Sequence, residues 1–340
     1  MRGALAGGLK VACLVACAVA FACSGFACSG STRSGNVFGD DGGGSSGGSG
    51  GSSSSGGGSS SGSFGDGGGS GSGSGGGNGC SGQAADFVYV LSAQNDLYSF
   101  APAAKKFTKI GALGCNTAMQ PNSMAVDRNA VAYVNYVQGN PATGQDSAGA
   151  IFQVSTQDAS CSGPIMSLPA SWYRLGMGYS SNNAGSTAET LYVAGTSGTP
   201  LGGSSPGLGL VDFGKKAIGP IGQFSGSLAG GNAELTGTGD GRLYGFFAST
   251  VQVAQINKTS GATQAPVTMT GVQPPNDWAF SFWGGHFYLY TSQGQGAGNG
   301  SNVTDYDPVS GSINPAYMTS IGFDIVGAGV STCAPTTPPQ

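Results

Sequence analysis

The sequence predicts an all-β protein, a five-bladed β-propeller with four-stranded blades. Two observations predict it. A short β-rich run centred on a tyrosine recurs five times, 44 to 59 residues apart. The first of these runs has no strand before it, but a spare strand-like run lies near the C-terminus, where it can complete the first blade. Repeats of this length with such a closure are typical of propellers. A β-sandwich or a β-solenoid is the alternative, but neither fold needs a displaced strand.

The tyrosine runs give the repeat its period. They read FVYVLSA, AVAYVNYV, ETLYVAGT, GRLYGFFA and HFYLYTSQ, with their shared residues at Tyr89, Tyr133, Tyr192, Tyr244 and Tyr288. Each is followed by a second β-rich run, from LYSFAP to NVTDYDP, and a third run then follows, such as KFTKIGAL, KAIGPIGQF or INPAYMTS. Turn sequences such as 258–261 and 308–311 separate the second and third runs, as hairpins require. No long helical periodicity occurs.

The innermost strand of each blade should precede its tyrosine run. SMAVD, RLGMGYS, AELTGTG and WAFSFWG fill this place in four blades, and Asp240-Gly241 and Gly284-Gly285 form tight turns after the last two. FDIVGAGV at 323–330 is the strand left for the first blade. We therefore expect the propeller to occupy 83–335, with 336–340 as a short tail.

The N-terminal part predicts export and anchoring. Residues 1–22 combine Arg2 and Lys10 with an uncharged apolar run, which is typical of a signal peptide and too short to span a bilayer. Cys23 follows at once, as in the lipobox of bacterial lipoproteins, so we expect it to carry the lipid. Cys17 and Cys28 are other choices, and a plain secretory signal is the alternative to an anchor. Residues 23–82 are almost wholly glycine and serine and predict a disordered tether.

Four cysteines lie beyond most of this tether. An even number in an exported domain predicts disulfides, although three pairings are possible and free thiols are the alternative. Cys80 precedes the first tyrosine run and Cys333 follows the spare strand, so a Cys80–Cys333 bridge would close the ring. Cys115 would then pair with Cys161.

Composition excludes several classes of function. Only 8% of the residues are charged and the formal net charge is −4, so a nucleic-acid partner is not expected, because it needs basic patches. The single histidine, His286, limits metal and acid–base chemistry, and it follows a turn. No phosphate-binding loop, GxSxG elbow or zinc-ligand spacing occurs, so we expect neither a cofactor nor a metal.

The organisation resembles a group of exported bacterial lipoproteins in which a Gly/Ser tether precedes a β-propeller. The resembling phrases are SMAVDRNAVAYV, LGMGYSSNNAGSTAETLYVA, ELTGTGDGRLYGF and the CAP near the end. The resemblance implies a lipid-anchored protein of the cell envelope, at the outer membrane or cell surface, and implies no activity.

Chemistry would be expected at the mouth of the central channel. The acids in or beside the innermost strands are Glu234, Asp277, Asp127 and Asp324. Paired carboxylates around the axis would suit a carbohydrate-active enzyme. Turn and hydrogen-bonding roles are the alternative for each, and Glu234, alone among small residues, is the most suggestive.

Aromatic side chains could instead form platforms for a ligand. Trp172, Tyr173, Trp278 and Trp283 could stack on sugars, although such residues more often pack between blades. We expect a non-catalytic binding or interaction module that takes a glycan or protein ligand. The carbohydrate-active enzyme is the second hypothesis, favoured if the acids converge at one mouth.

Overall fold

The computed structural model describes residues 80, 84–140, 142–196, 204–294 and 300–339. The predicted signal peptide, Cys23 and the tether up to residue 79 lie outside the described residues. No helix of the described residues is long and apolar enough to cross a membrane.

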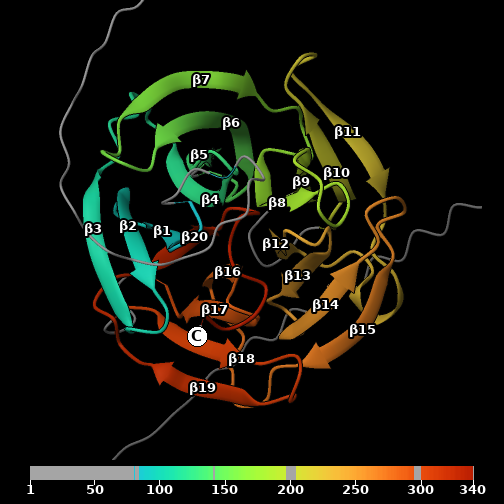
Figure 1. Cartoon of the computed structure of the whole chain (residues 1–340). Coiled ribbons are helices and arrows are strands. Elements are labelled where there is room, and N and C mark those ends of the chain that lie inside the picture. The colour runs from blue at the N-terminus through green and yellow to red at the C-terminus, as the bar shows by residue number, and fades with distance from the viewer. Residues whose placement is uncertain (1–79, 81–83, 141, 197–203, 295–299, 340) are drawn as a thin grey trace, which may run out of the picture. The chain divides into compact units, whose positions relative to one another are not determined.

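The described chain is a five-bladed β-propeller of four-stranded antiparallel sheets, which confirms the predicted fold (Figure 1). Blade one contains β1 (Val88–Ser92), β2 (Asp96–Ala101), β3 (Lys106–Ala112) and, innermost, β20 (Ile325–Gly329). The C-terminal strand pairs antiparallel with β1, Tyr89 lying opposite Gly329. The spare run therefore closes the ring.

The other blades follow the chain from the axis outward. Blade two contains β4 (Gln120–Val126), β5 (Val131–Gly139), β6 (Asp146–Ser155) and β7 (Cys161–Ser167). Blade three contains β8 (Arg174–Ser181), β9 (Glu189–Thr196), β10 (Gly207–Asp212) and β11 (Ala217–Gly222), with a single 3-10 turn, Gly226–Leu228, after it. Blade four contains β12 (Ala233–Gly237), β13 (Leu243–Phe247), β14 (Gln252–Ile256) and β15 (Thr263–Thr268). Blade five contains β16 (Asp277–Trp283), β17 (His286–Ser292), β18 (Asn302–Tyr306) and β19 (Ile313–Met318).

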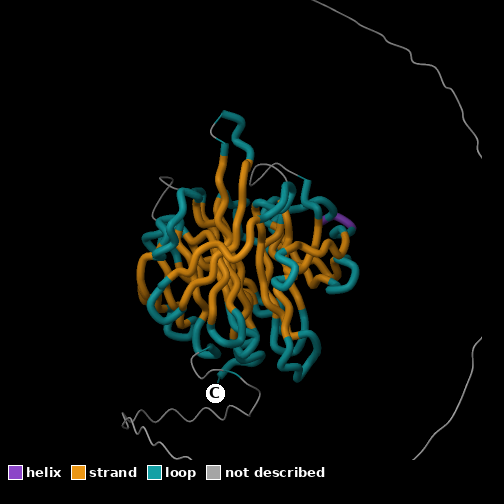
Figure 2. The backbone as a smooth tube through the Cα atoms, turned by 90° about the horizontal axis from the view of Figure 1, so that it is seen from above, coloured by secondary structure: helices purple, strands orange, loops and turns teal. Residues whose placement is uncertain are grey.

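The innermost strands β4, β8, β12, β16 and β20 contact one another around the axis. Glycines permit this approach: a Cβ on Gly176 of β8 would lie 1.9 Å from the carbonyl oxygen of Ala233, and one on Gly237 of β12 would lie 2.1 Å from that of Tyr179. In the side view the strands stand next to one another and the loops gather at two ends (Figure 2). We call the end where the innermost strands begin the mouth end, and the end where they finish the far end.

The core is divided into five apolar clusters, one at each interface between neighbouring blades. The tyrosines of the sequence repeat each pack into the cluster shared with the following blade: Tyr89, Tyr133, Tyr192, Tyr244 and Tyr288. The repeat therefore reflects blade-to-blade packing, with one tyrosine at each joint: Tyr89, Tyr192 and Tyr288 are buried, and Tyr133 and Tyr244 are partly buried.

Two disulfides join the four cysteines in the pairing expected from the sequence. Cys80 bonds to Cys333, which lies just after β20, and the bridge spans 253 residues of chain. Cys115, after β3, bonds to Cys161 at the start of β7 and so joins blades one and two. Structural disulfides of this kind are typical of proteins outside the cytoplasm.

Candidate functional site

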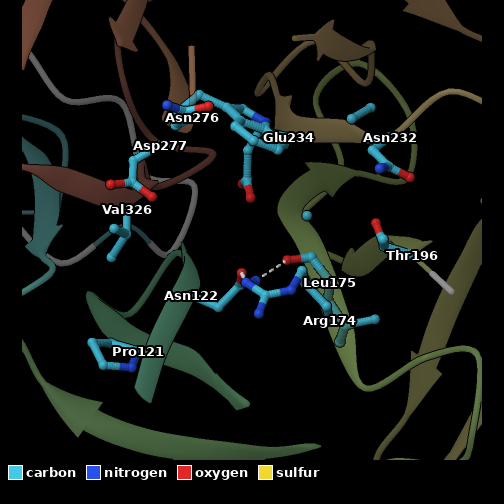
Figure 3. Close-up of a pocket in the computed structure, with 13 residues that line it drawn as sticks. Pro121, Asn122, Arg174, Leu175, Thr196, Asn232, Glu234, Asn276, Asp277 and Val326 are labelled. Atoms are coloured by element: carbon cyan, nitrogen blue, oxygen red, sulfur yellow. Dashed lines mark hydrogen bonds between the residues drawn. The ribbon is translucent and has the colours of Figure 1, made fainter. Parts of the chain in front are cut away.

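The mouth end of the channel gathers polar side chains from the starts of the innermost strands (Figure 3). They surround a cavity of about 80 Å³ and border a neighbouring hollow of about 400 Å³. Pro121, Asn276, Asp277 and Val326 line both spaces. The inner cavity has room for a few waters or for one functional group of a ligand. A larger ligand could therefore place only one end in it.

Arg174 is the cation of the inner cavity, and its guanidinium is already engaged. Its Nε and Nη2 each lie 3.0 Å from an oxygen of Asp146, and Nη1 donates to the side-chain oxygen of Asn122. This is a bidentate ion pair between β8 and β6, with geometry that fixes the guanidinium plane. Arg174 is therefore part of the wall, and its charge is balanced before any ligand arrives.

Glu234 on β12 points into the centre of the cavity region, toward blades two and three (Figure 3). The hydroxyl of Ser123 on β4 donates to its Oε2 at 2.7 Å, and the side chain is buried, with 6% of the residue exposed. Burial raises the pKa of Glu234 well above its usual value, and the hydrogen bonds from Ser123 and the Met177 backbone offset only part of this. The carboxyl group therefore keeps its proton to higher pH than an ordinary glutamate.

Asp277 and Asp324 lie on either side of the joint between blades five and one. Within the part of the chain that the structure describes, neither carboxylate has a hydrogen bond or an ion pair. Burial and then the nearby charge of Asp324 raise the pKa of Asp277, and the charge of Arg174 lowers it in part. Asp324 is buried and Asp277 is half-buried, and each side chain lines a hollow of the mouth end.

The structure thus separates the four acids that the sequence singled out. Glu234 and Asp277 line the same cavity, and Asp324 lies close to Asp277. Asp127 instead follows β4 at the far end, where its Oδ1 accepts hydrogen bonds from the backbone N–H groups of Asn129 and Val131. It holds a turn and lies outside the mouth.

Of the four aromatic candidates, only Trp278 lines the mouth cavity. Its indole Nε1 is buried and has no hydrogen-bond partner among the described residues. Trp172 packs in the joint between blades two and three beside Tyr173, and Trp283 donates from Nε1 to the carbonyl of Ala85 at 2.9 Å. Those three residues serve the packing of the ring.

His286 lies at the start of β17, toward the far end, and its Nδ1 is 2.8 Å from Asp305 of β18. His286 therefore lies at the opposite end of the ring from Glu234, Asp277 and Asp324. No group of three or more histidine, cysteine or acidic side chains that could hold a metal ion occurs in the described ranges.

Sequence reasoning missed Arg174, Asn122 and Asn276 as parts of the mouth. A signal was present: in PNSMAV, YRLGMG, GNAELT, PNDWAF and FDIVGA a polar side chain stands at the start of the apolar innermost strand. Because these strands run the same way around the axis, their first residues meet at one end.

No protein-family model matches the chain, and no curated protein matches it. Among solved structures, a chain of a nidogen/laminin complex is similar over 71% of this chain and 97% of its own, with 11% identity and a TM-score of 0.43. A Bacteroides caccae protein of unknown function is similar over 71% of this chain and 97% of its own, with 12% identity and a TM-score of 0.37. Regucalcin from Agrobacterium tumefaciens covers 61% of this chain and 65% of its own, with 12% identity and a TM-score of 0.36. These are distant structural neighbours of a β-propeller protein.

Proposed function

We propose that the protein is a lipid-anchored, non-catalytic binding module of the cell envelope, and that the mouth of its channel holds the polar end of a glycan or protein ligand. The observation that carries this proposal is the convergence of polar side chains from the starts of the innermost strands on one small cavity. A concave site with a few convergent polar groups is the ordinary form of a ligand pocket. The wider hollow beside it gives room for the rest of the ligand.

The state of the charged groups favours binding over catalysis. Arg174 is bound to Asp146 and Asn122, and Glu234 accepts hydrogen bonds from the cavity wall. Side chains that are fixed in this way can orient a ligand at little entropic cost. The amide side chains of Asn122 and Asn276 can both donate and accept, which suits hydroxyl and peptide groups.

A mouth-blocking variant tests the site. We expect full-length protein to retain particular spots on glycan and peptide arrays, and Val326→Trp to abolish that retention by filling the mouth. The matched control is Val309→Trp, because Val309 is 93% exposed in the turn between β18 and β19 at the far end. Equal retention by both variants would show that any ligand binds elsewhere.

The anchor has its own test, since Cys23 lies outside the described residues. We expect mass spectrometry of the mature N-terminus to find a diacylglyceryl group on Cys23, and Cys23→Ser to release the protein from the membrane fraction. Lipid on Cys17 or Cys28 would change the position of the lipidated cysteine but would still support an anchor. A mature chain without lipid would rule out the anchor and leave an exported protein.

A carbohydrate-active enzyme is the second candidate, because Glu234 and Asp277 line one cavity. A carboxyl group with a raised pKa beside a second carboxylate is the usual acid–base pair of glycosidases. This hypothesis requires turnover of a bound glycan, lost in both Glu234→Gln and Asp277→Asn although binding persists. Intact glycan after prolonged incubation with the protein would exclude it for that ligand.

A further inference from the structure

We propose that the far end of the ring carries a second ligand site, a hollow between blades two and three that binds a neutral sugar ring of the pyranose form. The site is separate from the mouth, so the inference goes beyond the proposed function. Three observations carry it: an exposed aromatic ring, a hollow of ligand size, and a wall whose polar groups accept hydrogen bonds.

The hollow lies beside Phe213, an aromatic side chain that the fold leaves exposed. Among the described residues, Phe213 and Val309 are the two large apolar side chains that are exposed, and 38% of Phe213 meets solvent. Phe213 follows β10 in the turn to β11, where Asp212 accepts a hydrogen bond at 2.9 Å from the Lys215 backbone N–H. The turn that carries the ring is thus fixed before a ligand arrives, which lowers the entropic cost of binding.

Two tyrosines extend the ring of Phe213 into an aromatic surface. The ring centroid of Tyr133, on β5 of blade two, lies 5.2 Å from that of Phe213. It lies 5.5 Å from that of Tyr179, near the end of β8 in blade three. Phe213 is exposed, Tyr133 is partly buried and Tyr179 is buried. The rings pack on one another, so they offer a surface on which a flat apolar face can lie.

A hollow of about 420 Å³ lies against these three rings. Volumes of roughly 300–1,000 Å³ are usual for ligand pockets. β9 begins and β10 ends beside it, which places it at the far end of two neighbouring blades (Figure 1). Its wall also contains the apolar side chains of Leu191 and Val211 and the polar side chains of Glu189, Thr190 and Asp212.

The polar groups of this wall accept hydrogen bonds more readily than they donate them. Glu189 accepts two hydrogen bonds within the protein, which leaves about two of the four acceptor positions of a carboxylate. Thr190 donates its hydroxyl proton to Asn182 at 2.7 Å, so its oxygen can still accept. A ligand that brings several hydroxyl donors therefore matches the wall.

The charges of the wall favour a neutral ligand. Lys215 Nζ lies 3.1 Å from Asp212, and Glu189 has its two hydrogen bonds, so neither carboxylate requires a cation. An anion would be repelled by Glu189, and a purely aliphatic chain would leave the remaining acceptors without donors. A quaternary ammonium is usually held inside an aromatic cage, whereas these rings pack together. A pyranose has both an apolar face of C–H groups and hydroxyl donors at its edge.

A panel of methyl pyranosides tests the inference on the full-length protein: those of glucose, galactose, mannose and N-acetylglucosamine. Saturation-transfer NMR should detect binding of at least one of them, with the strongest transfer to the C–H protons of one ring face. Sorbitol has similar hydroxyl groups on an open chain without such a face, and should bind about tenfold more weakly. No binding by any pyranoside, or equal binding by sorbitol, would overturn the inference.

Variants of the exposed ring then locate the site. Phe213→Ala should weaken pyranoside binding about tenfold, whereas Phe213→Trp should retain it because the indole ring can stack in the same way. Val309→Ala removes the other exposed apolar side chain and should change nothing. Thermal unfolding of each variant, followed by circular dichroism, separates loss of the ring from loss of the fold. Equal pyranoside binding by Phe213→Ala and the natural protein would overturn the site.

The mouth-blocking variant separates this inference from the proposed function. Pyranoside binding should survive in Val326→Trp and be lost in Phe213→Ala. The reverse pattern would place the sugar at the mouth, which would overturn the far-end site and support the proposed function. Binding of tetramethylammonium that depends on Phe213, without binding of any pyranoside, would overturn the sugar and assign the hollow to a cation.

Discussion

Acidic side chains at the two ends of the ring differ in their hydrogen-bond partners. At the far end, Glu189 accepts hydrogen bonds from the Arg128 backbone at 2.8 Å and from the hydroxyl of Thr332 at 2.7 Å. At the mouth end, Asp277 and Asp324 have no such partner in the described part of the chain. Glu189 therefore helps to join the segment after β20 to blade three, whereas Asp277 and Asp324 line hollows at the mouth end. Acids that line a concave site are candidates for contact with a ligand.

The segment after β20 joins several parts of the ring at the far end. Thr332 bonds to Glu189 in blade three, Cys333 is bridged to Cys80, and the Gly284 N–H of blade five donates to the carbonyl of Pro335 at 2.8 Å. Thr336 and Pro338, in the expected short tail, line a cavity together with residues of blade five. One short segment connects several blades at the end where the ring is closed.

The largest effect should come from removing this segment together with β20. Deleting Phe323 onward leaves β1 as an open edge and removes Cys333, so we expect aggregation and no cooperative unfolding. A domain holds only about 5–15 kcal/mol in total, which is less than the loss of a strand and its ring closure would remove. Thermal unfolding followed by circular dichroism checks this. A soluble fragment 84–322 with a sharp transition would contradict the closure.

The ring-closing disulfide should have the next largest effect. The bridge spans 253 residues, for which the chain-entropy model gives about 5 kcal/mol, although measured gains are often smaller. Cys80→Ser and Cys333→Ser should therefore lower the unfolding temperature equally, and the double variant should add little. Cys115→Ser is the comparison, because its bridge spans 46 residues and the model gives about 4 kcal/mol. Unequal effects of the two ring-closing variants would mean that one cysteine also acts alone.

At the mouth end, Glu234 should make stability depend on pH. Its pKa is raised in the folded state, so its contribution is complete below the ordinary glutamate pKa and is lost as pH rises through the raised value. Urea midpoints should therefore fall over this range in the natural protein and fall less in Glu234→Gln. A variant that follows the same pH curve would show that Glu234 is not the titrating group.

The smallest effect concerns the hydrogen bond from Thr332 to Glu189 at the far end. Thr332→Val removes the donor but keeps the shape, and should cost about 1 kcal/mol in the free energy of unfolding. Thr337→Val, at an exposed position of the same segment, should change it little. Equal urea midpoints for both variants would show that Glu189 finds another donor.

Much of the fold could be predicted from local patterns, and less of the site. The tyrosine repeat, the turn dipeptides and the spare strand gave the blade number and the closure, because each is a short-range feature of a repeating unit. The site depended on which ends of the innermost strands meet. Glu234 and Asp277 were recognised as acids near the axis, but so was Asp127, which follows its innermost strand and therefore lies at the opposite end.

What the sequence by itself determined is the ring. The spacing of the repeat predicts the blades, and its tyrosines pack at the five joints between them. The positions of Cys80 and Cys333 predict the disulfide that closes the ring. What only the tertiary structure decided is the electrostatic state of the mouth. Arg174 is neutralised by Asp146, 28 residues away in sequence, while Asp277 and Asp324 form no hydrogen bond or ion pair with any other described residue. Burial and pairing depend on groups that different blades bring together, and no local pattern records those distances.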